Sequence, residues 1–200
     1  MKDRVVYSLA AVLLWLYVYY TGQAEMIPVV LIPVVIHELA HVLAILCLGM
    51  RIRAVRLELR GLCIEYSGDG GWTEHAIAAA AGPVAGFFYA AAAGALSRSG
   101  YGQWLRLSGE ISFLLSAFNL IPVYPLDGGR IFFALAETFL EGDSGEILFR
   151  AVGNIAITVM LCAGVYLICR AHVTALLAAS LWLLLLQNEQ MPLVKGREIS

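Results

Sequence analysis

The chain has 200 residues, of which 60% are hydrophobic and 14% are charged, and its formal net charge is −2. Soluble globular domains carry about 25% charged residues, so this composition is typical of a protein that lies in a lipid bilayer. The small net charge and the absence of a basic cluster exclude most nucleic-acid-binding proteins. The four cysteines have neither metal-ligand nor paired spacing and give little support to a disulfide framework.

Six apolar segments are predicted to be membrane-spanning helices. They cover residues 5–20, 26–50, 75–96, 104–121, 151–169 and 173–187. The first segment is interpreted as a retained helix because no small-residue cleavage site follows it. Residues 131–140 are apolar but too few to span, and are predicted to form a short buried or interfacial helix. Residues 1–200 are thus predicted to form a single polytopic α-helical membrane domain.

The positive charges predict the orientation of these helices. With both termini in the cytoplasm, only Arg98, Arg106 and Arg170 of the 13 Lys and Arg residues fall on the outer side. This distribution follows the positive-inside rule. We therefore expect a multi-pass protein of the cell membrane with both termini cytoplasmic.

The segment 52–66 changes from a helical to an alternating pattern. Apolar residues alternate with polar or charged residues on both sides of Gly61. This pattern predicts a β-hairpin with one apolar face, close to the cytoplasmic membrane surface. Two interpretations stay open. The hairpin could be an amphipathic cap, or its edge could pair with an extended substrate strand.

The second span contains the sequence His37-Glu38-Leu39-Ala40-His41, and its other residues are apolar apart from Cys47. Residues four apart share a helix face, so both imidazoles can bind one metal ion while Glu38 lies alongside. Ionisable residues inside a membrane are rare and usually functional, which disfavours a chance occurrence. The pattern indicates a zinc-hydrolase motif within a membrane helix, and hence a protease that acts in the lipid.

A catalytic zinc site needs a third protein ligand and one position open to water. The acidic and histidine candidates near the membrane are Glu74, His75, Glu110, Asp127, Glu137 and His172. Asp127 is favoured because prolines and glycines on both sides of it break the helix. Irregular backbone at this depth is tolerated only where it is buried in protein or lines a watery cavity.

These motifs together resemble the site-2 protease family of intramembrane zinc metalloproteases. The resemblance rests on the HELAH residues and on the stretch NLIPVYPLDGGR at residues 119–130. The stretch AGPVAG at residues 81–86 is similar to the small-residue motif of that family. The six-span layout resembles the branch that contains the sporulation factor that cleaves a pro-sigma factor.

The resemblance implies a set of roles for residues of this chain. His37, His41 and Asp127 would bind Zn²⁺, Glu38 would be the general base, and Asn119 would help to hold the substrate or the oxyanion. The substrate would be a membrane-anchored protein, such as a pro-sigma or anti-sigma factor, in the lipid bilayer. A homo-oligomer or a regulatory membrane protein is left open as a further partner. Neither the PDZ domain nor the CBS domain of many relatives is expected here.

Two other functions remain as alternatives. Histidines and a carboxylate in a helical bundle could form the transit site of a divalent-metal transporter, although no internal repeat or second polar cluster is evident. A catalytically inactive, protease-like membrane scaffold is the other alternative. The alanines and glycines of residues 78–94 are interpreted as helix-packing positions only.

Overall fold

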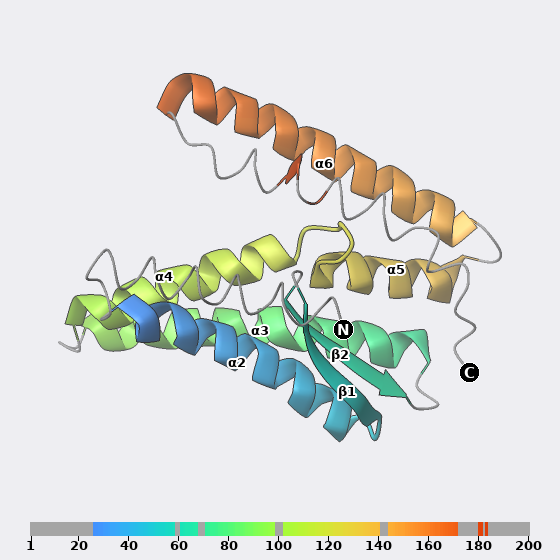
Figure 1. Cartoon of the computed structure of the whole chain (residues 1–200), viewed down its shortest axis with the longest axis horizontal. Coiled ribbons are helices and arrows are strands. Elements are labelled where there is room, and N and C mark those ends of the chain that lie inside the picture. Colours follow the sequence, from blue (N-terminus) through green and yellow to red (C-terminus); the bar gives the residue numbers. More distant parts are fainter. Residues whose placement is uncertain are drawn as a thin grey trace. The chain divides into compact units, whose positions relative to one another are not determined.

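A computed structural model describes residues 26–58, 61–67, 71–98, 102–140 and 144–171, together with residues 180, 181 and 183. Its elements are α2 (Met26–Cys47), β1 (Arg51–Glu58), β2 (Gly61–Ser67), α3 (Trp72–Arg98), α4 (Gly102–Asn119), α5 (Asp127–Phe139) and α6 (Ser144–Ala171) (Figure 1). The described part of the protein is therefore mostly helical. It falls into two compact units, one made of the residues up to 67 and of residues 80–118, the other of residues 71–79 and those from 119 onward.

Three described helices, α2, α3 and α6, are long and apolar enough to cross a membrane. They carry many exposed large apolar side chains, such as Leu31 on α2, Phe88 on α3 and Val159 on α6. Contiguous exposed apolar surface of this kind is unfavourable in water, and it suits a lipid environment. The protein is a membrane protein.

The prediction of six spans is not confirmed. The predicted first span, residues 5–20, lies outside the described residues, and so does nearly all of the sixth, residues 173–187. Helix α4 forms at the predicted fourth span, but it is not among the three candidate spans. Helix α6 begins at Ser144, seven residues before the predicted start, and the Arg150 guanidinium donates to the Glu146 carboxylate one turn earlier. A charge pair of this spacing extends a helix beyond its apolar part.

Helix α2 ends in a Schellman motif that turns the chain toward the strands. Gly49 has a φ of 76°. The Met50 N–H donates to the Ile45 carbonyl at 3.1 Å, and the Gly49 N–H donates to the Leu46 carbonyl at 3.0 Å. Met50 and Ile45, the two positions that often make an apolar contact in this motif, are both buried.

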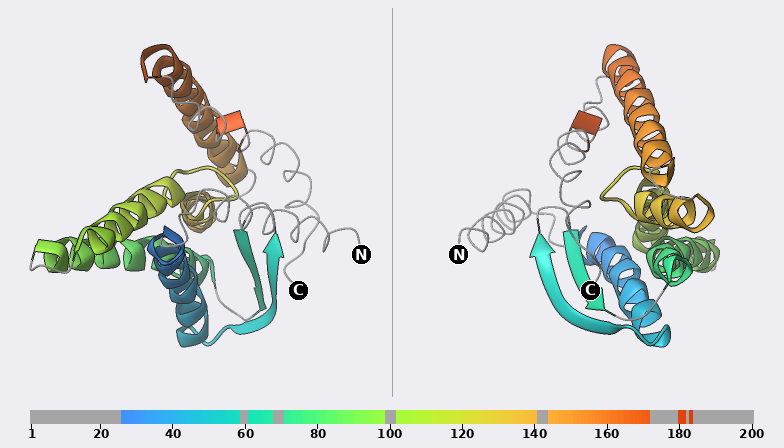
Figure 2. Two further views of the ribbon diagram at one scale, coloured as in Figure 1. Left: turned by 60° about the vertical axis from the view of Figure 1, so that its left-hand side comes forward. Right: turned by 90° about the vertical axis from the view of Figure 1, so that its right-hand side faces the viewer.

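Strands β1 and β2 pair antiparallel directly after this turn and contact α2 (Figure 2). They occupy the segment for which the sequence predicts a hairpin. The register places Val55 opposite Ile64 and Leu57 opposite Leu62, and it shifts between Ile52 and Ala54. Apolar residues therefore oppose apolar residues along the ladder, as the alternating pattern requires.

Helices α3 and α4 pack closely along what we call the α3–α4 seam, formed by Gly86, Tyr89, Ser108, Gly109, Ser112 and Ser116 (Figure 1). The Ser112 hydroxyl donates to the Gly86 carbonyl at 2.9 Å, and the hydroxyls of Tyr89 and Ser108 lie 2.9 Å apart. A Cβ on Gly109 would lie 2.9 Å from the Ala93 Cβ. Small residues thus bring the backbones together, and buried hydroxyls add hydrogen bonds between the helices.

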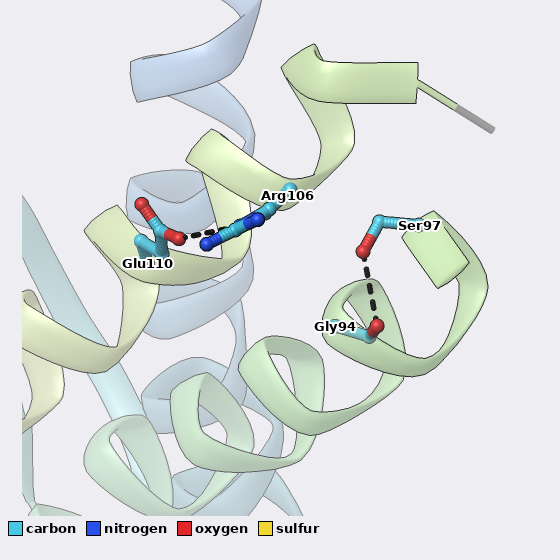
Figure 3. Close-up of polar contacts among 4 residues, drawn as sticks. All are labelled: Gly94, Ser97, Arg106 and Glu110. Carbon is cyan, nitrogen blue, oxygen red and sulfur yellow. Dashed lines mark hydrogen bonds and ion pairs between the residues drawn. The ribbon is translucent and has the colours of Figure 1, made fainter. Parts of the chain in front are cut away.

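At one end of this seam, α3 and α4 border a hollow of about 1030 Å³. Polar side chains on its wall interact within their own helices (Figure 3). Arg106 and Glu110 form an exposed ion pair at 2.9 Å, and the Ser97 hydroxyl donates to the Gly94 carbonyl. A Cβ on Gly94 would meet no atom within 4 Å.

In the second unit, aromatic rings join α5 to α6 and to the first turn of α3. The Phe133 ring lies 5.7 Å from the Trp72 ring and 5.4 Å from the Phe149 ring, both edge to face. Such pairs contribute about 0.5–1.5 kcal/mol beyond the burial of their area. Phe133 therefore fixes α5 against two other helices of this unit.

The Schellman turn gives a first prediction. Replacing Gly49 by Ala adds a methyl group that meets no atom, but it forces an L-residue into a left-handed conformation. We expect Gly49→Ala to lower the free energy of unfolding by about 1 kcal/mol, measured by denaturant titration in detergent. Gly94→Ala is the matched control, since Gly94 lies within a helix and faces open space. Equal stability of the two variants would contradict this account of the turn.

Candidate metal centre

His37 and His41 form a buried imidazole pair on α2. They are one helical turn apart, their exposed fractions are 4% and 8%, and their Nε2 atoms lie 3.2 Å apart. The ring planes meet at 78°. The i, i+4 spacing in an unbroken helix therefore brings the two nitrogens together, as the sequence predicts.

The separation of these nitrogens fits a metal ion. Zinc binds histidine nitrogen at about 2.0–2.1 Å, and two ligands of a tetrahedral ion then lie about 3.4 Å apart. The observed 3.2 Å is close to that value. Two buried imidazoles in an apolar helix are also a donor set of the kind that zinc prefers.

Helix α3 lies next to the histidine pair at Gly82, a residue with no side chain. A Cβ built on Gly82 would lie 2.2 Å from His41 Nε2 and 2.8 Å from His37 Nε2. Gly82 is itself buried. The sequence alone indicates only a helix-packing role for this glycine and does not predict its contact with the histidines. The AGPVAG motif was the available signal, but only the fold shows which of its residues faces the imidazoles.

Glu38 follows His37 directly on α2 and is half-buried. Successive helical residues point about 100° apart, so its side chain leaves the helix beside the face that carries the imidazoles. Its predicted role as the general base stays a prediction.

Asp127 is the first residue of α5 and is buried, with an exposed fraction of 7%. The Leu126 N–H donates to the Val123 carbonyl at 2.9 Å, and the Arg130 N–H donates to the Leu126 carbonyl at 3.1 Å. These bonds end the irregular stretch and begin the helix. A carboxylate in the first turn is stabilised by the positive end of the helix dipole.

The two glycines after Asp127 let this helix begin against the preceding loop. A Cβ on Gly128 would lie 2.1 Å from the Leu120 carbonyl oxygen, and one on Gly129 would lie 2.5 Å from the Val123 carbonyl carbon. Both contacts are with backbone atoms that cannot rotate away. The Asp-Gly-Gly sequence is therefore required by a backbone-on-backbone approach next to the carboxylate.

The remaining candidates differ from Asp127 in burial. Within the described residues whose burial is known, Asp127 is the only buried acidic side chain. Glu110 is exposed and paired with Arg106, and Glu74, His75 and Glu137 are half-buried. His172 lies outside the described residues. Asn119 is the last residue of α4 and is half-buried, and its predicted role stays a prediction.

His37 and His41 on α2 and Asp127 on α5 are buried side chains that could each offer one ligand atom to a metal ion. Two imidazoles and a carboxylate are a recurrent donor set of catalytic zinc sites, which leave a fourth position for water. The residues present therefore fit a catalytic zinc ion.

Comparison with known proteins found one family model and a similar fold. Residues 75–167 match the family model of peptidase family M50, a range that includes Asp127 but not the histidine pair. The fold is similar to that of a site-2 protease from Methanocaldococcus jannaschii, with a TM-score of 0.61 and 24% identity. That match covers 81% of this chain and 74% of the other. No curated protein sequence matches the chain.

The glycines of α5 give a second prediction. Gly128→Ala should destabilise the protein by about 3 kcal/mol, because the new methyl group overlaps the Leu120 carbonyl oxygen and neither backbone can yield cheaply. The loss is measured as a lower unfolding temperature in detergent. Gly145→Ala is the matched control, since its methyl group would meet first the end of the Glu137 side chain, which can rotate away. A Gly128 variant as stable as this control would refute the backbone contact.

Proposed function

We propose that the chain, whose residues 75–167 match the model of peptidase family M50, is a member of that family and an intramembrane zinc metalloendopeptidase that hydrolyses a peptide bond within or next to a transmembrane segment of a membrane-anchored protein. The observation that carries the proposal is the buried histidine pair of α2, with nitrogens 3.2 Å apart in a helix apolar enough to span a membrane.

Asp127 is the third protein ligand in this proposal. Its support is its burial, its place at the start of α5 and the fit of a carboxylate with two imidazoles as zinc donors. The ligands then come from two parts of the chain, 86 residues apart in sequence between His41 and Asp127.

The reaction follows from the types of side chain present. A zinc ion at these ligands would supply a water with a pKa lowered to about 7 and would polarise the scissile carbonyl. Glu38 accepts the proton of the attacking water and returns it to the leaving amine. The Asn119 amide donates a hydrogen bond to the oxygen that gains negative charge. His37, His41 and Asp127 keep their places throughout the reaction.

The substrate class follows from the location of the site. A site on a membrane-spanning helix is reached by a segment that is itself in the bilayer or beside it. Strands β1 and β2 lie next in the chain after α2 and could pair with that segment once it is extended. The finer assignment to a membrane-tethered pro-sigma or anti-sigma factor rests on the resemblance of the motifs alone. The proposed topology keeps both termini in the cytoplasm.

The proposed role of Glu38 predicts that its replacement impairs catalysis without impairing zinc binding. Glu38→Gln should retain zinc, because the metal ligands are unchanged, and should lower cleavage of a co-expressed single-pass membrane substrate about 100- to 10,000-fold, because the proton acceptor is lost. The measurements are zinc per protein by elemental analysis and the rate of appearance of the cleaved product.

His37→Ala is the control for this experiment and should lose both zinc and cleavage. Chelator treatment of the wild type should abolish cleavage, and added Zn²⁺ should restore it. Unchanged cleavage by Glu38→Gln would rule out the protease assignment. Zinc flux into proteoliposomes together with unchanged cleavage would favour a metal transporter.

A further inference from the structure

The small-residue segment of α3 contains glycines in three different environments. A Cβ on Gly82 would meet the imidazole nitrogens of His37 and His41, one on Gly86 would meet the Ser116 hydroxyl at 2.0 Å, and one on Gly94 would meet nothing. Gly82 and Gly86 are one turn apart and share a helix face. One of them therefore borders the metal ligands and the other borders the α3–α4 seam.

The space beside Gly82 is too small for a side chain. The missing Cβ would lie 2.2 Å from His41 Nε2, 2.7 Å from His41 Cε1 and 2.8 Å from His37 Nε2. Non-bonded carbon atoms pack best at about 3.5–4.0 Å, so a methyl group here would overlap both rings. The rings belong to buried side chains one turn apart on one helix, and they cannot move aside without separating their nitrogens.

The spacing of the two nitrogens is what a methyl group at residue 82 would disturb. A zinc ion lies about 2.0–2.1 Å from each histidine nitrogen that binds it, so both Nε2 atoms must stay within about 3.4 Å of each other. They lie 3.2 Å apart with glycine at residue 82. A methyl group there would displace the rings and separate these nitrogens.

We propose that Gly82 is a positioning residue for the metal ligands: its lack of a side chain lets both imidazoles lie against the α3 backbone with their Nε2 atoms close enough to bind one ion. This inference rests on the proposed function, since it assumes that the histidine pair holds zinc. It assigns to Gly82 a role that neither Gly86 nor Gly94 shares.

Gly82→Ala tests the inference, with Gly94→Ala as the matched control on the same helix. Wild type and Gly94→Ala should bind zinc with the same affinity, whereas Gly82→Ala should bind it at least 100-fold more weakly. Each protein is purified in detergent, stripped of metal and titrated with Zn²⁺. Replacement of zinc by Co²⁺ adds a spectroscopic readout, because the visible absorption of a tetrahedral cobalt site should be present in the control and absent from Gly82→Ala.

A second comparison separates loss of metal from loss of folding. If the methyl group collides with the imidazoles, Gly82→Ala should destabilise the metal-free protein, and this destabilisation should disappear when His37 and His41 are both replaced by Ala. Gly86→Ala should behave differently. The destabilisation caused by Gly86→Ala should be relieved by Ser116→Gly, because the new methyl group would meet the Ser116 hydroxyl and Cβ. It should persist when His37 and His41 are both replaced by Ala.

The outcomes distinguish the two proposals. Absence of zinc binding by the wild type would refute the proposed function and, with it, the role of Gly82. Zinc binding and a cobalt spectrum in Gly82→Ala equal to those of the wild type would refute the role of Gly82 alone. Gly82→Ala could also destabilise the protein equally whether His37 and His41 are present or replaced by Ala. That result would likewise refute the role of Gly82 and leave it with a part in helix packing only.

Discussion

The structure depends on placing two buried imidazoles side by side on one face of α2. His37 and His41 are almost fully buried, and their nitrogens are held 3.2 Å apart by one turn of α2. Burial of polar groups is unfavourable unless a partner compensates for lost hydration, and a metal ion with a carboxylate ligand provides such a partner. Three features are consistent with a metal ion at these imidazoles. They are the absence of a side chain at Gly82 of α3, the exposed apolar surface of α2 and the buried carboxylate at the start of α5.

Glycine serves three distinct purposes in this chain. Gly49 supplies a left-handed backbone conformation that ends α2 and directs the chain into β1. Gly82 and Gly86 leave room for side chains of neighbouring helices, whereas Gly128 and Gly129 leave room for backbone atoms of the preceding loop. The loss of stability on substitution differs accordingly. A side-chain hydroxyl group near Gly86 can rotate or be removed, whereas a main-chain carbonyl group near Gly128 or Gly129 cannot.

Much of the site follows from sequence because its geometry is local. The i, i+4 spacing of His37 and His41 places both nitrogens on one face of any helix, and the prolines and glycines around Asp127 mark the end of one helix and the start of another. The Gly82 contact is different in kind, since it depends on how α3 lies against α2. Helix α6 begins at Ser144, seven residues before the predicted span 151–169, because an apolar run marks a span and does not reveal the polar first turns, in which Glu146 and Arg150 pair along the helix.

The α3–α4 seam has a consequence for how a substrate reaches the site. Its serines are buried, Ser112 bonds the Gly86 carbonyl, and Gly109 brings the helix backbones nearly into contact with each other. A helix with its side chains is about 10 Å wide, so a transmembrane segment could pass between α3 and α4 only by breaking these hydrogen bonds and exposing their hydroxyls to lipid. The seam therefore gives a transmembrane substrate of the proposed kind no passage between these two helices.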